Sequence, residues 1–580
     1  MQMTKERLLT ILLTVLLACS TSTMHAQEEI IEHQGTSYVI HVDRLSPDSE
    51  MTLLDVLYLC PEFISNDGKN ITAEYAISVD DVTLSFYSLP LLQGIKACDL
   101  SVVTICNYGG VSIAAQGTVG TINLEFKEGS KGLDGKVALS GSTYGNGMIY
   151  ADMKSTGENL TLQAFAHTTQ QYGKADAIYN NKVSSRSSTE NAMLFANWNL
   201  SERDDLKLKF FQGFCDLKDH VQDDKETTIW PSFERYGEFS GIYEHQLNDN
   251  EATLHLETYL SYANCSSDTT KERSAYSSWI TEFSLPIFTE DLWMLAGWEI
   301  DYLNVNYPGL NREQYFNNDF YLQFDYTHGP WVLSIGDRFR VMNYWDKRDD
   351  SESLWSHHRN DNAFHASVGY KKDKHFVQGT ISHTYLEPSI SDFYTPYDED
   401  GNANYFTGYK TNLAWRAEAR YNYQTDNLVL TGSLLHTRLT EMIVPNEYLT
   451  SFRTSASWHK GPLRLTVGAN YHHRHISAGN DTKSVYDNFC TLKLAPTLLL
   501  GHGFRLSSVL LYSSKQEFCL YTHHAHLYAS VKVNKDLGKR CNIYADFHDI
   551  AGQPTGLADD LLQSYKNRAL TIGLTYYPFR

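Results

Sequence analysis

The stretch NLAWRAEARYNY, residues 412–423, alternates between two kinds of side chain. One parity carries apolar and aromatic residues and the other carries polar and charged residues: Leu413, Trp415, Ala417, Ala419 and Tyr421 against Arg416, Glu418, Arg420 and Asn422. Successive side chains of a β-strand point to opposite faces, so this pattern predicts a strand with one apolar face and one charged face.

The same alternation recurs from about residue 132 to the end of the chain, as in DDLKLKFFQG (204–213) and ATLHLETYLSY (252–262). Many of these runs last about ten residues and end in aromatics, whereas strands of soluble sandwiches average five or six residues. A tilted strand needs about 9–11 residues to cross a bilayer. Lipid offers no partner to an open sheet edge, so a spanning sheet must close. The fold class predicted is therefore a membrane all-β barrel with a charged lumen.

We predict about 22 antiparallel strands, an even number. They lie near 134–143, 146–154, 158–169, 188–199, 204–215, 233–245, 250–263, 274–287, 291–305, 316–327, 331–344, 361–371, 374–385, 410–423, 427–439, 447–459, 462–475, 486–499, 503–513, 519–533, 539–549 and 566–578. Tight polar or Gly/Pro joints such as LNDN (247–250) and THGPW (327–331) are expected at the periplasmic end. Longer links, such as 386–408, then fall outside.

The chain begins with an export signal. Lys5 and Arg7 precede an apolar run, Leu8–Ala18, that is far shorter than the roughly 20 residues of a spanning helix. Cleavage after Ala26 is the favoured processing. The alternative is a lipid on Cys19, because LLAC resembles a lipobox.

Composition excludes several functions. The formal net charge is -21 and no basic stripe appears, which argues against nucleic-acid partners. We find no GxSxG, HExxH, phosphate-binding or dinucleotide motif, so we expect neither an enzyme nor a cofactor. Eight cysteines follow Cys19 without zinc-ligand spacing, and scattered free thiols are favoured over one disulfide before residue 110.

Four segments precede the barrel in a fixed order: LLDVLYLCPEF (53–63), YAISVDDVTL (75–84), LLQGIKACDLSVVTIC (91–106) and GTVGTINLEFKEG (117–129). The first segment has helix-like spacing, and the second has the pattern of a strand. The third has the pattern of a short helix followed by a strand, and the fourth that of a Gly-rich turn leading into a strand. This order, with the barrel after it, resembles the plug-and-barrel TonB-dependent receptors of Gram-negative outer membranes. The patterning is similar to that of the smaller barrel proteins of the Bacteroidetes. The positions that align with the plug motifs of the family are Leu59, Pro61, Glu62, Val79, Asp80, Asp81, Val102, Val103, Thr104, Ile105, Gly117, Gly120, Ile122, Asn123 and Leu124.

The resemblance implies a signal peptide at 1–26, a small α+β plug at 27–130 and a barrel at 131–580. It also implies location in the outer membrane, contact with its lipid, and a TonB-type energy-coupling partner. That partner would bind a short extended segment near the mature N-terminus. The candidates for this TonB box are Glu28, Glu29, Ile30 and Ile31, although a plain polar tail that happens to contain two isoleucines is the favoured interpretation.

The function implied is binding and import of a scarce nutrient, with a metal, haem or chelate as the favoured cargo. The sequence departs from the family at Glu62 and Asp81, where glycine is usual, and the plug is short. These departures favour an alternative, a transport-inactive scaffold or surface partner of other envelope proteins.

Histidines cluster in three places expected near the outer mouth. His524 and His526 share one strand face, and His472 belongs to NYHHRHIS (470–477). Paired imidazoles suit a late first-row metal or haem iron. The favoured interpretation is that these are ordinary histidines of the membrane interface or the lumen. The strand of His472 and the strand of His524 and His526 are about 15 Å apart, which is too far for them to share one ion directly.

The charges Lys207, Lys209, Arg416, Glu418 and Arg420 are predicted to face the lumen. They could guide an anionic substrate. Salt bridges to the plug or across the barrel are the favoured alternative.

Overall fold

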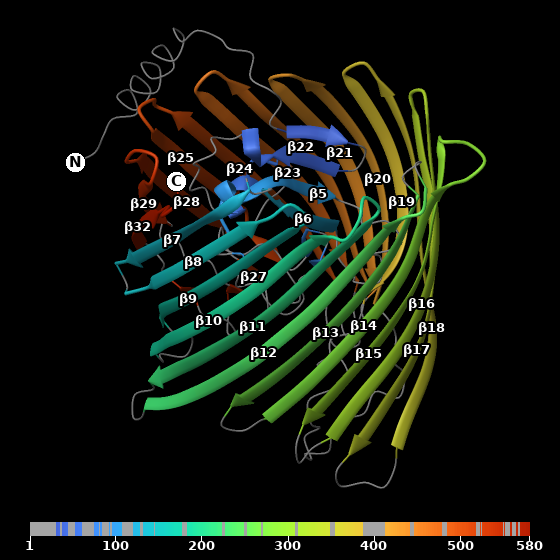
Figure 1. Ribbon diagram of the computed structural model, residues 1–580, viewed down its shortest axis with the longest axis horizontal. Helices are drawn as coiled ribbons and strands as arrows, with labels where there is room; N and C mark the ends of the chain where they lie inside the picture. The colour runs from blue at the N-terminus through green and yellow to red at the C-terminus, as the bar shows by residue number, and fades with distance from the viewer. Residues whose placement is uncertain are drawn as a thin grey trace.

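The fold is seen in a computed structural model of the whole chain (Figure 1). The structure describes residues 31–34, 37–44, 53–60, 75–80, 82–83, 92, 95–106, 120–127, 131–143, 145–176, 182–222, 227–248, 252–267, 271–307, 311–348, 354–386, 412–440, 446–477, 484–517, 522–523, 525–548, 550, 557–558, 564–565 and 569–579.

The described part of the chain from Gly132 onward forms a closed antiparallel barrel. Its wall has 22 strands, in addition to the two-residue strand β31 (Ser564–Tyr565). They are β7 (Gly132–Ser142), β8 (Gly147–Thr156), β9 (Leu160–Asp176), β10 (Lys182–Asn199), β11 (Asp204–Gln222), β12 (Thr227–Gln246), β13 (Thr253–Ser267), β14 (Lys271–Pro286), β15 (Leu292–Tyr307), β16 (Asn311–His328), β17 (Trp331–Arg348), β18 (Leu354–Lys372), β19 (His375–Leu386), β20 (Asn412–Thr425), β21 (Leu428–Thr440), β22 (Glu447–Lys460), β23 (Leu463–Ile476), β24 (Val485–Leu499), β25 (Phe504–Ser513), β28 (His526–Asp536), β29 (Cys541–His548) and β32 (Ala569–Tyr576). The ring closes where β32 pairs with β7, from Thr571 opposite Ser142 to Tyr576 opposite Val137.

Each of these strands coincides with one of the 22 predicted segments, so the predicted fold class is confirmed. Several strands are longer than predicted. β11 continues to Gln222 instead of 215, and β12 begins at Thr227 instead of 233. In both strands the extra residues lie at the end of the barrel where β7 finishes.

The wall has an apolar outer face and a polar inner face, as the alternation predicts. Phe210, Trp415 and Tyr421 are exposed outward, whereas Lys209 and Arg420 are buried inside. Among the described residues, no helix is long and apolar enough to span a membrane.

The two ends of the barrel differ in their connections. Short turns such as 247–252, 329–330, 373–374 and 461–462 all lie at the end where β7 begins and β32 finishes. Outer-membrane barrels keep short turns on the periplasmic side, so this end is the periplasmic end. The long link between β19 and β20 lies at the opposite, outer end.

The residues before the barrel form a six-stranded sheet inside it, in the order β1-β2-β5-β6-β3-β4. These strands are β1 (Ile31–Gln34), β2 (Ser37–His41), β3 (Tyr75–Val79), β4 (Val82–Thr83), β5 (Leu100–Cys106) and β6 (Gly120–Phe126). Two short 3-10 turns, η2 (Val42–Arg44) and η4 (Ala97–Asp99), and one helix, α2 (Leu53–Leu57), accompany them. The sheet packs its apolar side chains, Ile122 and Leu124 among them, into one core with α2.

Several predicted plug-motif residues have clear structural roles. Asp80 ends β3 with a φ of 46°, the left-handed conformation of a tight turn, and its carboxylate accepts the backbone N–H of Phe126 at 3.0 Å. Asn123 accepts the Ser78 hydroxyl at 2.8 Å, and Gly120 begins β6. Pro61, Asp81 and Gly117 lie outside the described residues.

The expectation of free thiols holds for the cysteines that the structure describes. They are Cys60, Cys98, Cys106, Cys215, Cys265, Cys490 and Cys541, and none of them forms a disulfide.

Candidate functional site

The plug is attached to the barrel wall by buried ion pairs. The Lys136 ammonium on β7 lies 2.6 Å from a carboxylate oxygen of Asp99 in η4, with both side chains at least 95% buried. The Lys532 ammonium on β28 lies 3.2 Å from Asp55 of α2. Each pair neutralises a lysine that would otherwise be buried with its charge uncompensated.

Further polar contacts fix the plug against neighbouring strands. Lys493 of β24 donates to the carbonyl of Cys60 at 2.5 Å, just after α2. The hydroxyls of Tyr38 in β2 and Thr431 in β21 lie 2.7 Å apart. Together with the ion pairs, these contacts place the plug against β7, β21, β24 and β28.

A group of four side chains, which we call the cationic cluster, lines the lumen wall on the outer side of the plug. It consists of Arg453 of β22, His472 and Arg474 of β23, and Phe489 of β24. The plug reaches the same wall at Thr466, whose hydroxyl donates to the carbonyl of Leu59 at 3.5 Å. His472 follows six residues later, which is roughly 20 Å along a strand.

Direct contacts organise the cationic cluster. The His472 ring stacks on Phe489 with 4.4 Å between centroids, and the Arg474 guanidinium carbon lies 4.6 Å from the Phe489 centroid. Arg474 also pairs with Glu447 at 2.9 Å, and Arg453 lies near enough to His472 for electrostatic repulsion. No protein group bonds the Nε of Arg453 in the described part of the chain.

This arrangement suits an anionic ligand. Guanidinium groups bind carboxylates and phosphates through forked hydrogen bonds. Phe489 is only 7% exposed and contacts both His472 and Arg474, so its ring positions these side chains. The donors Arg453 and Arg474 therefore form a binding point for negative charge on the outer side of the plug.

The structure describes only one residue of the predicted histidine pair. His526 begins β28 and is buried on the lumen side, as expected, while His524 lies outside the described residues. His472 stands on β23, three strand spacings from His526. Within the described ranges no group of three or more metal-ligating side chains gathers, so a metal at these histidines stays a prediction.

The five predicted lumen charges are all paired within the wall. Lys207 and Lys209 lie 3.7 Å from Glu244 and Glu238, respectively. The carboxylate of Glu418 lies 3.5 Å from Arg416 and 3.1 Å from Arg420. These distances favour the salt-bridge interpretation over guidance of a substrate.

The part of the wall formed by β16, β17 and β19 carries a larger network that sequence reasoning missed. Asp319 of β16 accepts from Arg340 at 2.7 Å and from the Tyr385 hydroxyl at 3.1 Å, and it also pairs with Arg338. Asp319, Arg338 and Arg340 occupy inward parity, so alternation could have placed them in the lumen. Tyr385 has the parity of the exposed Val377 and Ile381 of β19, so alternation would have placed it outside. Their partners lie on other strands, which alternation cannot identify.

The TonB-box candidate overlaps the plug sheet at its last residue. Ile31 begins β1 and is buried, with Ile40 of β2 as its antiparallel partner. Glu28, Glu29 and Ile30 lie outside the described residues. β1 is the edge strand of the plug sheet.

Comparison with known proteins supports the architecture. No protein-family model matches the sequence, and neither does any curated protein. Solved structures are similar: the FrpB iron transporter from Neisseria meningitidis (F3-3 variant) has a TM-score of 0.71 at 11% identity and covers 95% of this chain and 100% of its own. The copper transporter OprC has a TM-score of 0.72 at 11% identity, with coverage of 96% and 100%. The ferric yersiniabactin uptake receptor FyuA from Yersinia pestis has a TM-score of 0.68 at 13% identity, with coverage of 96% and 100%.

Proposed function

We propose that this chain, which has the fold of the plug-and-barrel TonB-dependent receptors, binds a scarce nutrient and imports it into the periplasm. Its location is the outer membrane of a Gram-negative bacterium, where closed barrels with an apolar outer face reside. The cargo we favour is an anionic metal chelate or haem. The observation that carries the proposal is a folded plug tied inside a closed barrel, with the cationic cluster above it.

The named solved structures support this direction, since they are transporters of iron and copper and an uptake receptor for ferric yersiniabactin. The cationic cluster adds a reason from this chain itself. Arg453 and Arg474 offer guanidinium donors to an anion, and the buried Phe489 ring holds Arg474 in position.

Import requires that the plug loosen, and β1 suggests how that happens. An edge strand presents unpaired backbone groups to which another chain can add as a strand. A periplasmic TonB-type partner that engages residues 28–31 would pull directly on the β1–β2 pair. The plug would then unfold first at β1 and afterwards toward the middle of its sheet. No covalent chemistry is involved.

The alternative function is a transport-inactive scaffold or surface partner of other envelope proteins. One observation favours it: Ile31 is already paired with Ile40 and buried, so part of the candidate TonB box is folded into the plug. A coupling segment is expected to be extended and accessible instead.

One uptake experiment separates the two functions. Cells that produce the intact protein, a variant lacking Glu28–His33, or Arg453→Gln are given labelled haem, ferric chelates, zinc or cobalamin. Cell-surface binding and energised uptake are measured separately for each probe. A length-matched Gly/Ser replacement of residues 28–30 controls for chain shortening.

A transporter predicts that the deletion abolishes energised uptake of one probe while surface binding persists. Arg453→Gln should weaken binding of that probe by about ten- to a hundredfold, since a charge-assisted contact contributes roughly 1.5–3 kcal/mol. Uptake that is unchanged by the deletion, with binding of none of the four probes, would instead establish the scaffold function.

A further inference from the structure

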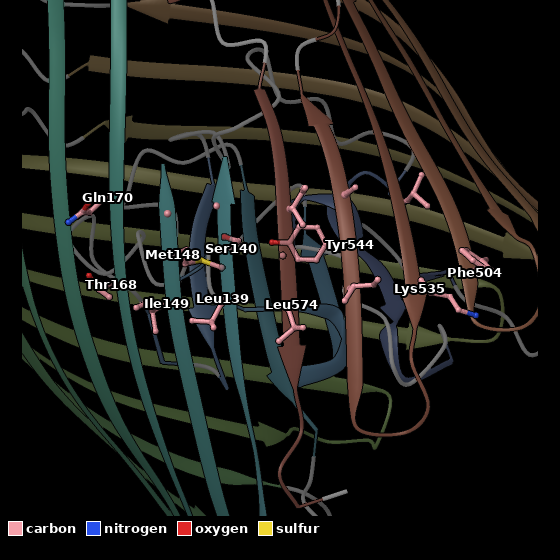
Figure 2. A pocket seen from close by; sticks show the side chains of 17 residues that line it. Leu139, Ser140, Met148, Ile149, Thr168, Gln170, Phe504, Lys535, Tyr544 and Leu574 are labelled. Carbon is pink, nitrogen blue, oxygen red and sulfur yellow. The ribbon is translucent and has the colours of Figure 1, made fainter. Parts of the chain in front are cut away.

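An apolar groove of about 910 Å³ crosses the outward face of the wall where the barrel closes. It runs over β8, β7, β32, β29 and β28, from Thr168 and Gln170 at one side to Lys535 and Phe504 at the other (Figure 2). The plug strands lie behind the wall in this view. The groove therefore faces lipid rather than the lumen.

Side-chain size explains the depression. Gly141, Gly147 and Ala545 occupy outward-facing positions in the groove and leave its floor low. Ile149 and Ile572 stand beside them with more than half of their surface exposed. The groove is thus a row of small residues bordered by large apolar ones, the shape of a channel for an acyl chain.

The end of the groove nearest the periplasm is basic. The Lys535 ammonium lies 4.2 Å from the centroid of Phe504, and it donates to the carbonyl of His502 in the turn that precedes β25. The turn that follows Lys535 carries Lys539 and Arg540, both exposed. One cation thus lines this mouth of the groove, and two more lie in the turn that adjoins it, in a chain whose net charge is -21. The neighbouring acid, Asp536, pairs with Arg505 at 3.3 Å.

We propose that this groove binds an anionic glycerophospholipid of the inner leaflet, with an acyl chain along Ile149 and Ile572 and the phosphate against Lys535, Lys539 and Arg540. Basic groups at a membrane border attract anionic lipids by about 1 kcal/mol each. A long lysine side chain can also lie along an apolar surface while its ammonium stays at the interface. The site depends on the membrane-spanning fold alone and not on the cargo.

The charge pattern selects this occupant. The cations sit at the periplasmic border, where a phospholipid phosphate lies, whereas the outer side of the groove ends in the uncharged Thr168 and Gln170. A lipopolysaccharide phosphate would need basic residues at that outer side. A second copy of the chain would need a ridge that fits the groove. The three cations would not strengthen such an apolar contact.

Retention of defined lipids by the full-length barrel tests the proposal. Wild-type protein in mixed micelles of phosphatidylglycerol and phosphatidylethanolamine is analysed by native mass spectrometry. The charge variant is Lys535→Gln/Lys539→Gln/Arg540→Gln. Its matched control is Lys371→Gln/Lys372→Gln/Lys374→Gln, which removes three exposed cations from the periplasmic turn between β18 and β19, across the ring. Ala545→Phe fills the groove, and Ala417→Phe makes the same change elsewhere on the lipid face.

We expect about one phosphatidylglycerol retained per wild-type barrel, in preference to phosphatidylethanolamine. Each cation removed from the groove should weaken that retention about fivefold. Ala545→Phe should abolish it, and both control variants should bind as wild type. Heat-modifiable migration in gels checks that every variant is folded. Equal loss in the groove and control variants, no preference for the anionic lipid, or lipopolysaccharide or a second copy in the groove would overturn the proposal.

Discussion

At the scale of single residues, the Lys136–Asp99 pair is the most consequential contact between plug and wall. It also touches the last residues of the chain, because Tyr577 donates to the thiol of Cys98, which lies 3.6 Å from the Lys136 ammonium. Removing one partner of a buried pair costs about 3–5 kcal/mol, since the other charge stays buried. We therefore expect Asp99→Asn to lower the free energy of unfolding of the plug by roughly that amount. The measurement is the rate at which a protease cleaves the plug as the urea concentration rises, and the variant should be cleaved faster.

The double variant Lys136→Met/Asp99→Leu is the matched control, because it removes both charges and keeps the apolar bulk. Replacing a buried pair with apolar residues is often neutral or stabilising. The double variant should resist proteolysis at least as well as wild type. If Asp99→Asn and the double variant behave alike, the pair does not fasten the plug.

The sequence predicts some of these residues and not others. Asp80 is named from the sequence as a plug-motif position, and the structure places it in a turn after β3, where Asp tolerates the left-handed conformation. Lys136 occupies an inward parity in β7, but its partner is 37 residues earlier in another domain. Pairings of this kind depend on how the plug sits in the barrel, which no local pattern encodes.

At the scale of strands, tyrosine rings pack closely against glycines of the neighbouring strand at several places in the wall. Gly297 of β15 lies opposite Tyr321 of β16, and a Cβ added to this glycine would fall 2.1 Å from the tyrosine ring. The Tyr321 hydroxyl donates to Glu282 at 2.9 Å, so the ring has little freedom to move. Gly297→Val should therefore lower barrel stability by about 1–3 kcal/mol through overpacking.

The control is Gly432→Val on β21, where a Cβ meets no atom within 4 Å. Position 432 faces outward, and valine favours strands, so the control should be neutral. Urea unfolding in detergent, followed by heat-modifiable migration, measures both variants. A destabilised Gly432→Val with a normal Gly297→Val would refute the packing argument.

All 22 strands could be predicted because lipid forces an apolar outer face on every one of them. Their outer ends could not, because strand segments beyond the membrane lose that requirement. DLKDHVQ (216–222) continues β11 without an apolar alternation, for example. Backbone pairing with β10 on one side and β12 on the other extends the strand there.

At the scale of the whole molecule, the wall closes without help from the plug. The backbone pairing of β32 with β7 completes the ring, and the plug adds side-chain contacts through Lys136, Lys493 and Lys532. A barrel of 22 strands has a lumen wide enough to need a plug. Deleting residues 27–130 should thus leave a folded barrel with a water-filled channel.

Planar-bilayer recordings of the deletion variant are expected to show steady ion conductance, while the intact chain should stay closed. Water can solvate Lys136 and Lys532 once the plug is gone, so the uncovered charges should not unfold the wall. The conductance of Asp99→Asn should fall between those of the deletion variant and the intact chain. It should show brief openings, because the substitution loosens the plug without removing it. A deletion variant that fails to show heat-modifiable migration would mean that the plug is part of the folding core. A folded variant that conducts no better than wild type would mean that the described plug is not what blocks the lumen.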